Sequence, residues 1–184
     1  MGRQLFQDGA YIDPPVNPGT LPAQITPGSI AAMWVGAQYT PIYANDPKAG
    51  KIYCIKAGGI MTMSVATCTF VITPRYGTGG TSMGASPAQL LPAMTGVPWI
   101  LDAELIWCKI GVSTGSWAIC IGKFCCQGTI ATAGAGTVIP FGGLTNVTSL
   151  DATINSCLEI CVTAGGTVGS PTLITHYAYI FSRN

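Results

Sequence analysis

From Tyr39 to the C-terminus, the chain is a series of short runs rich in valine, isoleucine, threonine and aromatic residues, most of them ended by glycine or proline. No segment of ten residues shows the 3.6-residue periodicity of an amphipathic helix. β-Branched and aromatic residues fit the pleated surface of a sheet, and closely spaced turn residues favour antiparallel strands. The sequence therefore predicts an all-β domain, either a sandwich or a barrel.

Six runs are the clearest strand candidates. They are Lys51–Lys56, Ile60–Thr73 (as one or two strands), Trp99–Val112, Trp117–Cys126, Thr153–Thr163 and Thr172–Phe181. We expect Gly58 and Gly59 to end the first strand, and Thr78–Pro98 to be a long loop because prolines and glycines interrupt it. For the run Gly128–Gly136, the sequence does not decide between strand and loop.

Alternation within two of these runs indicates which faces are buried. In Trp99–Val112, large apolar residues share the face opposite Asp102 and Glu104. Further along this run the second face becomes apolar too, which a β-bulge or a second covered face would explain. In Cys157–Val162, one face is aliphatic, whereas Glu159 shares the other with two cysteines, and we expect that face to be partly wet. Burial on two sides is typical of a protein that packs into an assembly.

The N-terminal part of the chain differs from the rest. Residues 1–38 contain prolines every few positions, so they cannot form a helix or a central strand. Their apolar residues favour an extended arm that lies along a neighbouring subunit over a disordered tail. The domain organisation predicted is an extended Pro/Gly-rich arm, residues 1–38, followed by a β-sandwich domain, residues 39–184.

The low charge of the chain constrains its surroundings. Only 8% of the residues are charged, and the formal net charge is +1, whereas soluble domains average about 25% charged residues. A surface so poor in charge is expected to be covered by other subunits, most simply by copies of itself. No basic patch indicates nucleic-acid binding. We also expect no signal peptide and no membrane span, because Asp8 and Asp13 interrupt the N-terminus and the uncharged stretches are broken by turn residues.

Eight cysteines at irregular spacing include no CxxC pair. With no sign of secretion, we expect them to be reduced thiols that act as small apolar residues. Asn146 starts a glycosylation sequon, which would matter only in a secreted protein.

A catalytic triad is the sharpest alternative that the residues offer. GxSxG occurs at Gly111–Gly115 and at Gly80–Gly84, and the order Ser113, Asp151, His176 matches that of α/β-hydrolases. The motif needs a strand-to-helix turn, however, whereas Ser113 lies between two β-like runs. We therefore expect Ser113 in a hairpin turn and His176, the only histidine, as a packing residue on an apolar strand face.

Other candidate sites are weaker still. Asp102 and Glu104 could act as an acid and base pair, but we expect them to be solvated or to meet lysine or arginine on a neighbouring strand. Cys157 and Cys161 are too far apart along one strand to share a metal easily. We expect no catalytic residues, no metal and no cofactor, and the chain is predicted not to be an enzyme.

Three segments carry a resemblance to a family. They are GKIYCIKAGGIMTMSVATCTFVITPRYG (Gly50–Gly77), TGVPWILDAELIWCKIGVSTGSW (Thr95–Trp117) and SLDATINSCLEICVTAGGTVGSPTLITHYAYIF (Ser149–Phe181). This succession of a Gly-flanked strand, a Thr-rich strand with an Arg-Gly turn, a Trp-led strand and a closing hairpin resembles the jelly-roll virion proteins of tailed bacteriophages. The resemblance covers about residues 34–184, and the eight cysteines depart from it.

The resemblance implies a jelly-roll-like β-sandwich that forms a homotrimer and binds the phage head. The function expected is that of a capsid decoration (cement) protein that bridges major capsid subunits. Its partners would be itself and the major capsid protein or another virion protein, and it would be made in the host cytoplasm and located in the virion. The alternatives are a phage tail or minor tail protein, a receptor- or glycan-binding jelly-roll module, a secreted trimeric jelly roll and a serine hydrolase.

Overall fold

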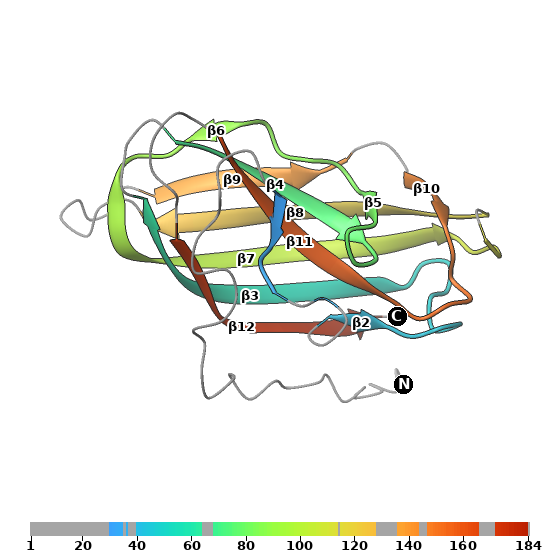
Figure 1. Ribbon diagram of the computed structural model, residues 1–184. Helices are drawn as coiled ribbons and strands as arrows, with labels where there is room; N and C mark the ends of the chain where they lie inside the picture. Colours follow the sequence, from blue (N-terminus) through green and yellow to red (C-terminus); the bar gives the residue numbers. More distant parts are fainter. Residues whose placement is uncertain are drawn as a thin grey trace.

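The computed structural model describes residues 30–34, 36, 40–63, 68–113, 115–127, 136–143, 147–165 and 172–183. Two antiparallel sheets of six strands each make up the fold, so the predicted all-β class is confirmed (Figure 1). Most of the predicted arm, the sequon at Asn146 and the Gly/Ala/Thr run before Gly136 lie outside the described residues.

One sheet has the order β12-β3-β7-β8-β10, with β9 also paired to β8. Its strands are β3 (Ile52–Met63), β7 (Met94–Lys109), β8 (Ser116–Gln127), β9 (Gly136–Gly142), β10 (Val147–Leu150) and β12 (Thr172–Arg183). We call it the long-strand sheet, because four of its strands have 12 or more residues.

The other sheet has the order β1-β11-β4-β5, with β2 paired to β11 and β6 to β4. Its strands are β1 (Ile30–Ala32), β2 (Pro41–Ile42), β4 (Thr69–Tyr76), β5 (Thr81–Ser82), β6 (Gln89–Leu90) and β11 (Ser156–Gly165). In Figure 1, β4 and β11 cross over the long-strand sheet at an angle.

Aromatic residues fill the core between the two sheets. The ring of Phe124 on β8 stacks on that of Trp99 on β7 and contacts that of Phe70 on β4, with centroid distances of 5.4 and 5.5 Å. Tyr76 of β4 meets Trp107 of β7 edge-on at 5.5 Å. Buried rings of β4, in one sheet, thus contact buried rings of β7 and β8 in the other sheet. The fold is therefore sandwich-like.

The glycine pair Gly58-Gly59 does not end a strand, contrary to the expectation from sequence. β3 continues through both residues, because a bulge between Thr175 and Tyr177 of β12 lies directly against them. A Cβ atom on Gly59 would lie 1.9 Å from the carbonyl oxygen of Ile174. Glycine is thus required here by the close approach of the neighbouring strand.

The loop expected at Thr78–Pro98 is only partly a loop. The short strands β5 and β6 lie within it, and β7 already begins at Met94. On β7, the apolar face predicted from Trp99 to Trp107 is buried. At the end of this face, the pairing of β7 with β8 shifts register between Trp107 and Lys109. This shift fits the β-bulge, one of the two explanations that the sequence left open, but it lies after Ile106, which stays on the same face as Asp102 and Glu104.

The face of β11 that carries Glu159 is buried and not partly wet, so that expectation was wrong. Glu159 is only 4% exposed. A Cβ atom on Gly36 would lie 2.4 Å from its Cγ atom, and the backbone N–H of Gly79 donates to its Oε2 atom at 3.0 Å. The chain around Gly36 and the turn after β4 therefore cover this face, which the sequence of β11 alone does not reveal.

The last residues of the predicted arm belong to the sandwich. β1 pairs with β11, and the next residues, Met33 and Trp34, are buried in the core. The Trp34 indole N–H donates to the hydroxyl of Thr40 at 3.0 Å. The domain therefore begins at Ile30 or earlier, whereas the sequence placed its start at residue 39.

Candidate functional site: the outer face of the long-strand sheet

The outer face of the long-strand sheet is the surface for which the described residues most clearly suggest a role. It consists of the side chains that point away from the core on β12, β3, β7, β8 and β9. They include Ile52, Lys56, Ile100, Asp102, Glu104, Ile106, Ile119, Ile121, Lys123, Val138, Tyr177, Tyr179, Phe181 and Arg183. We call this set the outer face, and most of its members are apolar.

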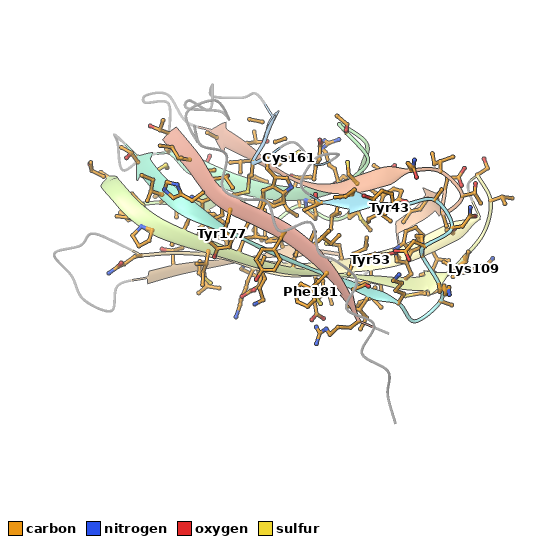
Figure 2. The ribbon with its side chains drawn as sticks, turned by 90° about the horizontal axis from the view of Figure 1, so that it is seen from below. Tyr43, Tyr53, Lys109, Cys161, Tyr177 and Phe181 are labelled. Atoms are coloured by element: carbon orange, nitrogen blue, oxygen red, sulfur yellow. The ribbon has the colours of Figure 1, made fainter. Side chains whose placement is uncertain are left out.

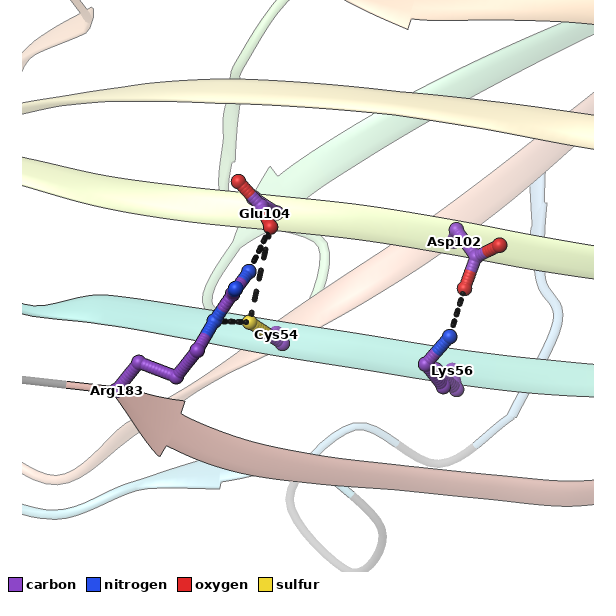
Figure 3. Close-up of polar contacts among 5 residues, drawn as sticks. All are labelled: Cys54, Lys56, Asp102, Glu104 and Arg183. Carbon is purple, nitrogen blue, oxygen red and sulfur yellow. Dashed lines mark hydrogen bonds and ion pairs between the residues drawn. The ribbon is translucent and has the colours of Figure 1, made fainter.

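Two ion pairs lie in the middle of the outer face (Figure 3). The Lys56 ammonium on β3 meets the Asp102 carboxylate on β7 at 2.7 Å, across a pair of directly opposed residues. The Arg183 guanidinium on β12 meets the Glu104 carboxylate on β7, although β3 lies between these strands. From the sequence we expected both carboxylates either to be solvated or to meet lysine or arginine on a neighbouring strand, and it is the second alternative that applies here. This is confirmed for Asp102, whereas Glu104 meets its partner one strand further away.

The thiol of Cys54 lies beneath the second ion pair. Its Sγ atom is 3.0 Å from Nε of Arg183 and 3.9 Å from Oε1 of Glu104. Burial raises the pKa of Cys54, and the hydrogen bond and positive charge of Arg183 oppose that shift. Cys54 is therefore held as a covered, neutral thiol.

A shallow groove of about 490 Å³ follows this central part of the sheet. Its lining residues are Cys54, Ile55, Lys56, Asp102, Ala103, Glu104, Ile121, Gly122, Lys123, Phe181 and Arg183. The backbone of Gly122 lines the groove, and a Cβ atom at this position would point into the core, within 2.3 Å of the buried Phe141 ring. Because the groove is open and its carboxylates are paired with cations, it suits a protein surface better than an enclosed small molecule.

Apolar side chains lie on both sides of the charged centre. Ile100 and Ile121 are each 50% exposed, and Val138 is 59% exposed. Along β12, the rings of Tyr177, Tyr179 and Phe181 form an aromatic ladder with centroid distances of 6.2 and 6.1 Å. Figure 2 shows Tyr177 and Phe181 on β12, which lies nearest the viewer there. Exposed apolar side chains gathered on one face are typical of a protein-binding surface, and here the two ion pairs lie among them.

The structure brings Ser113 and Asp151 together, since a backbone hydrogen bond of Ser113 helps to lower the pKa of Asp151, but His176 is remote and no triad forms. Ser113 lies in the turn between β7 and β8 with a φ of 56°, which confirms the hairpin turn predicted from the sequence. The Asp151 carboxylate accepts hydrogen bonds from the backbone N–H and hydroxyl of Thr153, which lower its pKa. His176 lies at the other end of the sheet, where β12 and β3 run beside the start of β7. The second motif serine, Ser82, is exposed on β5.

The expectation that His176 packs on an apolar face was wrong. His176 lies in the β12 bulge and is exposed. The bulge changes the parity of the strand, so that Leu173 points inward before it and Ala178 and Ile180 point inward after it. The aromatic ladder lies on the face of β12 opposite to Ala178 and Ile180. It was not predicted, although the i, i+2 spacing of its residues is visible in the sequence.

The cysteines do not form a metal-ligating group in the part of the chain that the structure describes. All eight are free thiols, and six of them are buried. Within the described residues, no three histidine, cysteine, aspartate or glutamate side chains are arranged to hold a metal ion. Burial raises the pKa of Cys120 to about 12 and that of Cys126 to about 11.

Comparison of the chain with protein-family models, with curated proteins and with solved structures found no match. No helix among the described residues is long and apolar enough to span a membrane.

Proposed function

We propose that the chain is a structural virion protein of a tailed bacteriophage, and specifically a trimeric decoration (cement) protein that bridges major capsid subunits. The observation that carries this proposal is the outer face of the long-strand sheet. Its exposed isoleucine, valine and tyrosine side chains surround two ion pairs, in a chain with only 8% charged residues. Such a face loses unfavourable contact with water when another protein covers it.

The strand pairing supports a jelly-roll-like fold as part of this proposal. β3 pairs with β12, and β4 pairs with β11, so that the earliest long strands meet the latest ones. Nested pairing of this kind is what results when a long hairpin wraps into two sheets. The meander β7-β8-β9, in which consecutive strands are neighbours, departs from a simple wrapped hairpin.

The mechanism proposed is reinforcement by many contacts of modest size. A protein–protein interface of ordinary size buries about 1,600 Å² in total. Symmetric binding of many copies across the joints between capsid subunits adds such contacts over the whole head, even when each is weak. In this proposal, residues 1–29 extend the reach of each copy along the particle.

Binding to particles assembled without the chain tests the proposal. We expect Ile100→Lys and Ile121→Lys, which place charge on the outer face, to reduce the occupancy measured by co-sedimentation. Val112→Lys is the matched control, because Val112 is 71% exposed in the β7–β8 turn, away from this face. Equal occupancy of all three variants and the wild type would contradict the assignment of the outer face.

Removal of residues 1–29 tests the role of the N-terminal segment. Because β1 begins at Ile30, this deletion leaves every described strand intact. We expect weaker particle binding with an unchanged melting temperature. Light scattering on the same samples reports whether the chain is a trimer, and a mass of one or two copies would contradict that part of the proposal.

The aromatic ladder favours a second candidate, a glycan-binding module. Tyr177 is 42% exposed, and aromatic rings can stack on the apolar faces of sugars. A glycan array discriminates between the two functions. A specific signal that Tyr177→Ala removes would support the glycan-binding module, or a tail protein that recognises a receptor, over capsid decoration.

A further inference from the structure

The outer edge of β12, from Tyr177 to Phe181, differs from every other sheet edge in the described part of the chain. β12 has 12 residues and pairs on one side with β3, and no other described strand pairs with it. In Figure 1 it is the outermost strand of its sheet. Such an edge presents a row of backbone N–H and C=O groups that a further strand could pair with.

The other edges carry features that limit pairing. β1, β2, β5 and β6 have only two or three residues each, and β10 has four. β9 has seven residues, and Pro140 in its middle has no N–H to donate. Short strands and prolines at edges are the usual protection against pairing with another chain.

Among the described residues, the one such protection on β12 is the bulge at Thr175–Tyr177, and beyond it the segment Tyr177–Phe181 pairs regularly with β3. This segment contains no proline and no charged residue, and its outward side chains are the three rings of the aromatic ladder. The edge is therefore suited to a strand that is itself apolar and aromatic.

We propose that β12 pairs antiparallel with β12 of a second copy of this chain, about a twofold axis at Tyr179, so that the two long-strand sheets form one continuous sheet. This contact goes beyond the proposed function. Because the contact has twofold symmetry, it joins two copies of the chain. If the chain is a trimer, the two copies belong to neighbouring trimers; if it is a monomer, the contact forms a dimer.

The aromatic ladder supports a second copy as the occupant. With Tyr179 opposite its own equivalent, Tyr177 of each copy faces Phe181 of the other, so that every ring meets a ring on the same face of the sheet. Aromatic pairs directly opposite each other are among the favourable cross-strand pairs. A shift by two residues in either direction leaves rings without ring partners.

Charge supports the antiparallel orientation. Arg183, at the end of β12, would lie at the far end of the paired segment from Arg183 of the other copy, so that the two Arg183 side chains would be far apart. A parallel arrangement would place them side by side, where like charges are unfavourable. The ion pair of Arg183 with Glu104 stays on the outer face of its own sheet in the antiparallel arrangement.

Charge substitution at the self-opposed position tests the proposal. Tyr179→Glu and Tyr179→Lys each place two like charges opposite each other across the twofold axis. We expect either variant alone to weaken self-association about tenfold or more, and an equimolar mixture of the two to restore it. Light scattering would show the mass fall by half, to the 19.0 kDa of one chain if the wild type is a dimer and from six copies to three if trimers are joined.

Controls separate this effect from misfolding. Tyr179 is opposite Lys56 on β3, so Tyr179→Glu gains a favourable neighbour within its own chain and is expected to melt no lower than the wild type. Val112→Glu and Val112→Lys carry the same charges in the exposed β7–β8 turn and should leave the mass unchanged. Self-association that survives both Tyr179 variants, or a mixture that associates no better than either alone, would overturn the proposal.

Residues 1–29 are the competing occupant of the edge. If the full chain shows no twofold association but the chain from residue 30 does, the edge is covered by the N-terminal segment in the full protein, and the proposal is wrong. None of these measurements uses capsids. Loss of particle binding with intact twofold association would contradict the proposed function alone.

Discussion

Arg183, the last residue of β12, forms an ion pair with Glu104 across the whole width of β3. The arginine side chain passes over Cys54, whose thiol lies 3.0 Å from its Nε atom (Figure 3). Three strands are thus connected on the outer face by one charged side chain and one sulfur. Both charged groups are largely exposed, so their contact contributes more to the arrangement of the surface than to stability.

Arg183→Met removes this charge and keeps an apolar stem over Cys54. We expect the free energy of unfolding to fall by less than about 1 kcal/mol, because exposed ion pairs contribute little. The pKa of Cys54, already raised by burial, should rise further, since the hydrogen bond and charge of Arg183 are the influences that lower it. The pH dependence of alkylation at Cys54, followed by mass spectrometry, measures this shift.

Lys56→Met is the matched control for that experiment. It removes the neighbouring ion pair with Asp102 and should leave the alkylation profile of Cys54 in place. A profile that moves to lower pH in Arg183→Met would mean that the arginine acts mainly as a cover for the thiol.

Gly59→Ala is expected to destabilise the protein by about 1–3 kcal/mol, the usual range for an overpacked interior position. The added methyl group would lie 1.9 Å from the backbone carbonyl oxygen of Ile174, so that β3 and β12 must separate at the bulge. In Gly136→Ala, the nearest atom to the new Cβ is 3.4 Å away, and we expect a change of less than about 0.5 kcal/mol. Urea unfolding followed by circular dichroism compares the two variants, and equal effects would contradict the close approach.

The approximate positions of the long strands could be predicted from the sequence. The places where two neighbouring strands approach each other closely could not. Alternating large apolar residues place the core face of β7 from Trp99 to Trp107, because this pattern depends only on the strand itself. Gly58 and Gly59 were assigned to a turn because glycine is poor in strands. Their role depends on the bulge at Thr175–Tyr177 of β12, which is far away in the sequence.

On the outer face, too, some features could be predicted from the sequence and others could not. The carboxylates of Asp102 and Glu104 could be assigned to one face by their spacing, and they were expected to be solvated or to meet basic partners on a neighbouring strand. Which partner each would meet depends on the strand order β12-β3-β7, and this order is not encoded in any local pattern. His176 was placed on the wrong face for the same reason, since a bulge reverses inside and outside beyond one residue.

Phe124→Ala tests how much the contact between the sheets contributes. The Phe124 ring is fully buried between Trp99 and Phe70, so its removal leaves a cavity that both sheets line. We expect the free energy of unfolding to fall by about 3–5 kcal/mol. Val138→Ala, at an exposed position on the adjacent strand β9, should change it by less than about 0.5 kcal/mol. Similar losses in the two variants would contradict a shared core.

Stability should fall at alkaline pH because of the buried thiols. In the unfolded chain a cysteine titrates near its ordinary pKa of 9.0, whereas in the folded chain burial raises the pKa of Cys120 to about 12 and that of Cys161 to about 11. Above about pH 9, the unfolded state therefore binds fewer protons than the folded state, and the free energy of unfolding decreases as pH rises. Each unit of pKa difference corresponds to about 1.4 kcal/mol when the pH exceeds both values.

Urea unfolding at a series of pH values from about 8 to about 11 measures this loss. Cys120→Val replaces the most deeply buried thiol with an apolar side chain of similar size, so its stability should decline less steeply over this interval. Cys108→Ser, at a partly exposed position on β7, should show the slope of the wild type. A wild-type curve that is flat up to pH 11 would show that these thiols are reached by water in the folded protein, because only hydrated thiols keep an ordinary pKa.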